Sequence, residues 1–201
     1  MRAFDLVVFD LDGTLVDSRR DLADSVNALL DERGAARLPE SAIGAMVGDG
    51  AKQLVARACA AAGVVDHGGA LPRFLELYDE RLIAHTRPYD GMAATLESLA
   101  ARGIRRAVFT NKPQAAAERV LAGLDLARWF DAGVLGAEGA HPRKPDPAGL
   151  LWLAGACGAA IGRTLMVGDA SQDVETARRA GSRVCVARYG FGFSTAEPLL
   201  E

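Results

Sequence analysis

The chain has 201 residues, of which half are hydrophobic and 24% are charged, and its formal net charge is −3. This composition predicts a packed core, either as one domain or as one domain with an insertion, and excludes a disordered chain. The small net charge gives no reason to expect nucleic acid or a membrane as a partner, and no segment has the roughly 18 apolar residues of a membrane helix. Cys59, Cys157 and Cys185 lack CxxC spacing, and the first residues lack a signal-peptide pattern, so we expect a cytoplasmic protein.

Short apolar runs alternate with Ala/Leu/Glu/Arg-rich segments along most of the chain. The apolar runs predict strands at residues 5–9, 106–110, 132–135, 164–167 and 183–187. The segments between them predict helices at residues 92–102, 114–122, 148–157 and 171–180. Apolar runs without polar alternation are typical of parallel strands buried on both faces. The predicted fold is therefore α/β, with a Rossmann-like, doubly wound parallel sheet.

One long interval breaks this alternation. Between residues 16 and 87 the pattern predicts helices and no strand, with the helices at residues 20–33, 39–47, 51–62 and 71–85. Such an interval is far longer than an ordinary connection between a strand and a helix. We therefore expect an α/β core, residues 1–15 and 88–201, and an inserted helical subdomain, residues 16–87, that acts as a lid.

Two aspartates, Asp10 and Asp12, follow the first predicted strand. On an extended chain residues i and i+2 share a side, so both carboxylates are expected to face one point at the ligand-binding end of the sheet. Two adjacent acids favour a divalent cation and a nucleophilic or acid–base role. A simple turn is the alternative, because Asp and Gly both favour turns. An EF-hand loop is excluded, because Leu15 and Asp21 stand where that loop needs glycine and glutamate.

Three further strand ends or loops carry polar residues. Thr110 and Asn111 precede a predicted helix, where a hydroxyl and backbone N–H groups can hold an anion. Lys144 stands in a loop that two prolines make rigid, and Asp169 and Asp173 follow an apolar strand and a glycine. Each group has a structural alternative. Thr110 or Asn111 could be a helix cap, Lys144 a solvated surface lysine, and Asp169 part of a capped turn. Together they suggest one site, because parallel strands end at the same edge.

In this order the motifs resemble those of the haloacid dehalogenase-like superfamily of Mg²⁺-dependent phosphatases and phosphotransferases, and the helical insertion resembles its small cap. The resemblance implies that Asp10 is the nucleophile and forms an aspartyl-phosphate. It implies that Asp12 protonates the leaving oxygen and then deprotonates the attacking water. Mg²⁺ would be held by the Asp10 carboxylate, the Asp12 backbone carbonyl and the Asp169 carboxylate. Dehalogenases of the superfamily lack the second aspartate, so Asp12 favours phosphate esters.

The same resemblance assigns the remaining polar residues to the phosphoryl group. Thr110 and the Asn111 backbone N–H would bind its oxygens, and Lys144 would neutralise their charge. Asp173 would orient Lys144 or a water on the metal.

Within the superfamily the chain is similar to bacterial phosphoglycolate phosphatases. The similarity lies at residues 9–18, 47–55 and 110–113, and at residues 189–192 after the last predicted strand. It implies a substrate contact from the cap, and our hypothesis is that Lys52 or Arg57 binds the carboxylate of 2-phosphoglycolate; a solvated helix face is the alternative for both. Arg19-Arg20, in place of the usual proline, predicts a different cap hinge. The chain ends at Glu201, where that group continues, so we expect a short or incomplete C-terminal part and an exposed sheet edge.

Several functions therefore stay open. The expected one is Mg²⁺-dependent hydrolysis of 2-phosphoglycolate to glycolate. Alternatives are a phosphomutase of the β-phosphoglucomutase type, or a phosphatase for another small phosphorylated metabolite such as a sugar phosphate, a nucleotide or pyrophosphate. A non-enzymatic domain is a third class, against which the complete acid, threonine and lysine set argues. The expected partner is a small phosphorylated metabolite, and both a monomer and a homodimer are compatible with the sequence.

Overall fold

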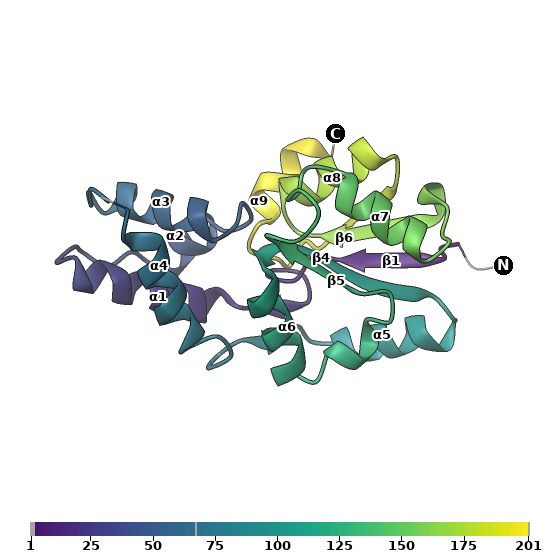
Figure 1. Cartoon of the computed structure of the whole chain (residues 1–201), viewed down its shortest axis with the longest axis horizontal. Helices are drawn as coiled ribbons and strands as arrows, with labels where there is room; N and C mark the ends of the chain where they lie inside the picture. The colour runs from purple at the N-terminus through teal and green to yellow at the C-terminus, as the bar shows by residue number, and fades with distance from the viewer. Residues whose placement is uncertain (1–2, 67, 201) are drawn as a thin grey trace.

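The computed structural model describes residues 3–66 and 68–200, which contain a five-stranded sheet in the order β5-β4-β1-β6-β7 (Figure 1). The strands are β1 (Leu6–Phe9), β4 (Arg105–Pro113), β5 (Val134–Ala137), β6 (Thr164–Gly168) and β7 (Arg183–Val186). Neighbouring strands pair in parallel, and Phe9 lies opposite Val108 on one side and Val167 on the other. The predicted α/β class is confirmed, and β7 is an edge strand within the described part of the chain.

Helices cover both faces of this sheet, as Figure 1 shows. They are α5 (Met92–Ala101), α6 (Gln114–Gly123), α7 (Ala148–Ala156) and α8 (Ser171–Ala180). Because side chains alternate along a strand, Phe9 packs in the core on the α5 and α6 side, and Val8 packs with α7 and α8 residues on the other. Shorter elements complete the domain: η1 (Ala127–Trp129), η2 (Ile161–Arg163), α9 (Phe193–Ala196) and η3 (Glu197–Leu199). We call residues 3–15 and 88–200 the sheet domain.

The inserted residues form a separate helical lobe, which lies beside one end of the sheet in Figure 1. Its helices are α1 (Arg19–Glu32), α2 (Glu40–Gly44), α3 (Ala51–Ala61) and α4 (Ala70–Asp79). Buried Leu29, Leu54 and Phe74, from three different helices, belong to one apolar cluster. The predicted helices are thus present, although α2 and α4 are shorter than expected.

The prediction that this interval contains no strand is wrong at its two ends. Strand β2 (Val16–Asp17) pairs antiparallel with β3 (Arg87–Pro88). The outgoing and returning passages of the insertion run side by side there, so their backbone groups satisfy one another. This two-stranded ladder is the junction between the lobe and the sheet domain.

Asp21 of α1 fixes the returning passage. Its fully buried carboxylate accepts hydrogen bonds from the backbone N–H groups of His85 and Thr86 and from the Thr86 hydroxyl, at 2.7–3.0 Å. These donors are therefore unavailable to a helix that continues through His85, and α4 ends earlier, at Asp79.

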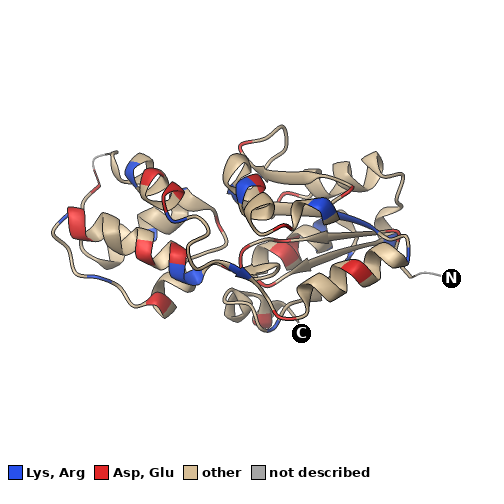
Figure 2. Ribbon diagram, turned by 90° about the horizontal axis from the view of Figure 1, so that it is seen from below, with Lys and Arg blue, Asp and Glu red and all other residues tan. Residues whose placement is uncertain are grey.

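The charged residues are distributed as the small net charge predicts. Figure 2 shows acidic and basic residues mixed along the ribbons of both the lobe and the sheet domain. Among residues 3–66 and 68–200, none of the helices combines the length and the apolar character needed to span a bilayer.

Candidate active site

The sheet brings the predicted strand-end residues to one edge. Asp10 directly follows the central strand β1, which lies between β4, carrying Thr110, and β6, which Asp169 follows. The Asp10 backbone N–H donates to the Val167 carbonyl at 2.8 Å, so the register continues past the strand. The expected gathering of these residues follows from the parallel order of the three strands.

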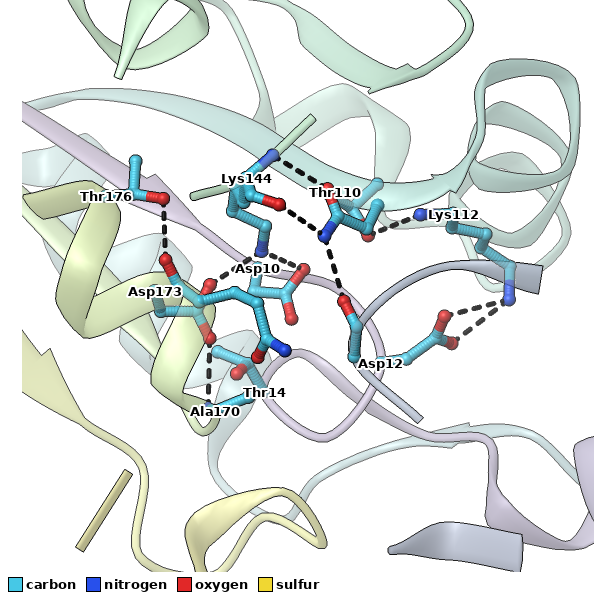
Figure 3. Close-up of polar contacts among 12 residues, drawn as sticks. Asp10, Asp12, Thr14, Thr110, Lys112, Lys144, Ala170, Asp173 and Thr176 are labelled. Carbon is cyan, nitrogen blue, oxygen red and sulfur yellow. Dashed lines mark hydrogen bonds and ion pairs between the residues drawn. The ribbon is translucent and has the colours of Figure 1, made fainter. Parts of the chain in front are cut away.

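Lys144 lies between two of the acids (Figure 3). Its Nζ is 2.8 Å from Asp10 Oδ1 and 2.6 Å from Asp173 Oδ1. All three side chains are at least nine-tenths buried. Burying an ion pair is tolerable only with close partners, and here one ammonium serves two carboxylates. Asp173 also caps α8 by accepting from the Ala170 N–H at 3.0 Å.

The Asp169 carboxylate is hydrogen bonded and lies so close to the Gly13 backbone that a side chain there would clash with it. It accepts hydrogen bonds from the Thr14 hydroxyl at 3.0 Å and from the Gly192 N–H at 2.7 Å. A Cβ at Gly13 would lie 2.2 Å from Asp169 Oδ2, and the φ of Gly13 is +91°. Glycine is therefore required at this position both by contact and by backbone conformation.

The acids at this edge carry more negative charge than their surroundings neutralise. Oxygens of Asp10, Asp169 and Asp173 all lie within 4.8 Å of one another. Burial raises the pKa of Asp10 to about 6, although nearby Lys144 opposes the shift. Burial and the Asp10 charge raise the pKa of Asp169 to about 8. Three carboxylates facing one ammonium form an oxygen-rich site that fits a divalent cation.

Asp12 has different hydrogen-bond partners from Asp10, although both residues line the same cavity. Its carboxylate oxygens lie 3.0 and 3.1 Å from Lys112 Nζ, and the Ser18 hydroxyl donates to it at 2.6 Å. The difference arises because β1 ends at Phe9, so strand alternation does not extend to Asp12. Figure 3 shows the Asp12 side chain directed toward Lys112.

Lys112 is a site residue that the sequence reasoning missed. Its ammonium is buried and hydrogen bonds with the Tyr78 hydroxyl of α4, which joins the lobe to the sheet domain. The signal was present in the sequence, because Lys112 stands two residues after Thr110 in β4, where side chains share a side. For Tyr78, which lies in the inserted helices, the sequence contains no comparable pattern.

Thr110 and Asn111 are both buried at the end of β4. The Thr110 hydroxyl accepts from the Lys112 N–H at 3.2 Å. The Asn111 amide donates to the carbonyls of Gly48 and Lys144 at 2.9 and 3.0 Å, and its oxygen accepts from the Lys144 N–H at 2.9 Å. The Asn111 side chain thus ties the lysine loop to the lobe.

A small cavity of about 50 Å³ lies between the lobe and the sheet domain. Its sheet-domain wall includes Asp10, Asp12 and Thr110. Apolar residues dominate the lobe wall, which includes Leu22, Val47, Leu54, Phe74 and Leu75.

The two residues predicted to bind substrate from the lobe stand elsewhere. Lys52 is exposed and borders a neighbouring cavity together with Glu138 and Arg143. Arg57 is exposed and forms an ion pair with Asp49, while donating to the Met46 carbonyl at 2.9 Å.

Comparison with known proteins shows the family of the chain. A model of the haloacid dehalogenase-like hydrolase family matches residues 4–181. A phosphoglycolate phosphatase from Rhodospirillum rubrum is 45% identical over 193 residues, which cover 92% of this chain and 80% of the relative. One from Pseudomonas syringae pv. tomato is 36% identical, covering 98% of this chain and 73% of the relative.

A solved structure is also similar to this chain. The crystal structure of a predicted phosphoglycolate phosphatase from Haemophilus somnus 129pt superimposes with a TM-score of 0.90 at 32% identity, covering 98% of this chain and 92% of that one. The motifs, the sheet order and these similarities agree, and the chain belongs to the haloacid dehalogenase-like hydrolase family.

Proposed function

We propose that this hydrolase is a Mg²⁺-dependent phosphatase that converts 2-phosphoglycolate into glycolate and inorganic phosphate. The observation that carries the proposal is the buried Asp10 carboxylate, which borders the cavity and lies 2.8 Å from Lys144 in the acid cluster. The relatives named phosphoglycolate phosphatase support the choice of substrate.

In the proposed reaction an Asp10 oxygen attacks phosphorus, and the bond between phosphorus and the ester oxygen breaks. The ester oxygen keeps the electron pair, takes a proton from Asp12 and leaves as the hydroxyl of glycolate. Water then attacks the aspartyl-phosphate and gives its proton to Asp12. The bond from phosphorus to Asp10 breaks, which releases inorganic phosphate and restores both carboxyl groups to their starting states.

The remaining residues bind and neutralise the phosphoryl group. We propose that Thr110 and the Asn111 N–H bind its oxygens and that Lys144 offsets its charge. The 2.6 Å contact between Lys144 and Asp173 supports a positioning role for Asp173. Mg²⁺, held by the Asp10 and Asp169 carboxylates and the Asp12 carbonyl, would supply further charge neutralisation. The excess of carboxylates over ammonium groups supports that cation.

We also propose that residues 16–87 act as a cap that moves to admit substrate. A space of about 50 Å³ accommodates only one or two water-sized molecules. The lobe joins the sheet domain through β2 and β3, which are two residues each. Domain closure over a small substrate is a common way to exclude water.

The test is phosphate release from 2-phosphoglycolate, compared with a sugar phosphate, a nucleotide and pyrophosphate, in Mg²⁺ or in EDTA. We expect the highest kcat/KM for 2-phosphoglycolate and loss of turnover in EDTA. Asp10→Asn should reduce turnover to background, whereas Asp24→Asn, with a half-exposed side chain on α1, is the matched control. A higher kcat/KM for another ester would reject the substrate. A sugar phosphate isomerised without phosphate release would identify a phosphomutase instead.

A further inference from the structure

The cavity beside Asp10 has an uneven distribution of charge. Among the described residues that line it, Lys112 alone is positively charged, while Asp10 and Asp12 are acids and much of the rest is apolar. Lys144 contacts Asp10 from outside the lining. A substrate that carries a second anionic group besides its phosphoryl group therefore meets one cation within the cavity.

We propose that Lys112, together with the Tyr78 hydroxyl, binds the substrate carboxylate and selects acids whose carboxylate is one carbon from the phosphate ester oxygen. This inference rests on the proposed function, because it concerns the same cavity and the same reaction. It replaces Lys52 and Arg57 as the partners of that carboxylate.

The position of Lys112 relative to Asp12 sets the length of the substrate. In the proposed reaction Asp12 protonates the ester oxygen, so that oxygen lies within hydrogen-bond distance of the Asp12 carboxylate. Lys112 Nζ lies 3.0 Å from the same carboxylate. A carboxylate joined to the ester oxygen through one carbon is therefore within reach of the ammonium, without any contact from the outer surface of the lobe.

The hydrogen-bonding capacity of the pair also suits a carboxylate. The three donors of the Lys112 ammonium now face the two Asp12 oxygens and the Tyr78 hydroxyl. By releasing one Asp12 oxygen, Lys112 keeps its bond to the other and donates to a second anion. The Tyr78 hydroxyl is buried and hydrogen bonds with Lys112, and no other partner for it is found among the described residues. As acceptor from Lys112 it keeps its own O–H for a substrate oxygen, and a carboxylate can accept both bonds.

A purely structural role for Lys112 predicts a different result. If Lys112 only positions Asp12, its loss slows every phosphate ester to the same extent. If it binds the substrate carboxylate, its loss reduces the preference for an acid over a neutral ester of the same length. The decisive quantity is thus a ratio of kcat/KM values, not an activity.

The experiment compares 2-phosphoglycolate with 2-hydroxyethyl phosphate, in which a hydroxymethyl group replaces the carboxylate. We expect Lys112→Met to lower the ratio of their kcat/KM values about a hundredfold, as for the loss of buried charge-assisted hydrogen bonds. Tyr78→Phe, which removes only the hydroxyl, should lower the ratio about fivefold. Arg37→Met, at a largely exposed cap arginine, is the control and should leave the ratio unchanged.

Turnover does not need to survive for the inference to be tested. In the Asp10→Asn background, calorimetric titration in Mg²⁺ measures the affinity of both esters with and without Lys112→Met. Loss of affinity for 2-phosphoglycolate alone supports the assignment, and an equal loss for both esters overturns it. A Lys112→Met enzyme with the wild-type ratio overturns it too, as does a ratio that falls in Lys52→Met instead. A wild-type enzyme without any preference for 2-phosphoglycolate rejects the proposed substrate, which is a separate failure.

Discussion

Asp21 offers a direct test of how the lobe is held to the sheet domain. We expect Asp21→Asn to weaken the contact between α1 and the returning passage, because the buried carboxylate serves three donors there. The His85 N–H now lies 2.9 Å from Asp21 Oδ1 and 3.0 Å from Oδ2. Asparagine keeps one acceptor oxygen, but its amide group at the Oδ1 position would meet this N–H. Two donors would then face each other in a buried position.

The expected loss of free energy of unfolding follows from the hydrogen bonds that Asp21→Asn changes. Hydrogen bonds to a charged acceptor contribute about 1.5–3 kcal/mol each, and neutral ones about 0.5–1.5 kcal/mol. Loss of the charge at three such bonds therefore lowers the free energy of unfolding by about 3 kcal/mol. That is a large part of the roughly 5–15 kcal/mol that stabilises an ordinary domain.

Urea unfolding at pH 7 in Mg²⁺ measures this effect, with unchanged m-values as a check that the two variants unfold alike. Asp24→Asn is the control, because its half-exposed side chain lies on the same helix and makes a 3.6 Å ion pair with Arg20. Thr86→Val removes one donor and should cost about 1 kcal/mol. If Asp21→Asn is within 1 kcal/mol of the control, the carboxylate does not hold the returning passage.

Two further predictions concern the acid cluster. Because the pKa of Asp169 is raised to about 8 and that of Asp10 to about 6, the folded protein binds more protons than the unfolded chain above pH 4. The metal-free Tm should therefore fall from pH 5 to pH 8.5, with Mg²⁺ raising it most at high pH; a metal-free Tm that rises would contradict the charge assignment. Gly13→Ala should weaken Mg²⁺ binding at least tenfold in calorimetry, because its Cβ would meet Asp169 Oδ2 at 2.2 Å. Gly34→Ala, at a φ of +67° with open space around it, should cost about 1 kcal/mol of stability without changing Mg²⁺ affinity.

Much of the fold could be predicted because the core strands are buried on both faces. Such strands are continuous apolar runs, as at Leu6–Phe9, and their limits are clear. The limits of β4 and β5 were less clear. The ladder between them shifts register between Phe109 and Pro113, which pairs Pro113 with Ala137 and extends both strands beyond their apolar parts. Hydrophobic periodicity does not encode such an irregularity.

The site was predictable where a motif is contiguous with a strand end, as for Asp10, Thr110 and Asp169. It was not predictable where two separately folded parts meet. Lys112 and Tyr78 are 34 residues apart, and their contact depends on how α4 lies over the end of β4. Neither local propensity nor residue spacing specifies that arrangement.

The contacts between the lobe and the sheet domain suggest how selection and chemistry are divided. Opening of the lobe would separate Tyr78 from Lys112, the Gly48 carbonyl from Asn111, and Asp49 from Gln172, all of which join the two parts. The contacts of Lys144 with Asp10 and Asp173 lie within the sheet domain and would persist.

An open enzyme would therefore keep the proposed phosphoryl-binding residues in place while the proposed carboxylate site is incomplete. Closure would rebuild the Tyr78 and Lys112 pair around the acid, so that the binding energy of the carboxylate favours the closed state. On this reasoning a neutral ester still reacts with the sheet-domain residues, but it lacks the interaction that favours closure. Selectivity would then reside in kcat as well as in KM, because closure also excludes water from Asp10.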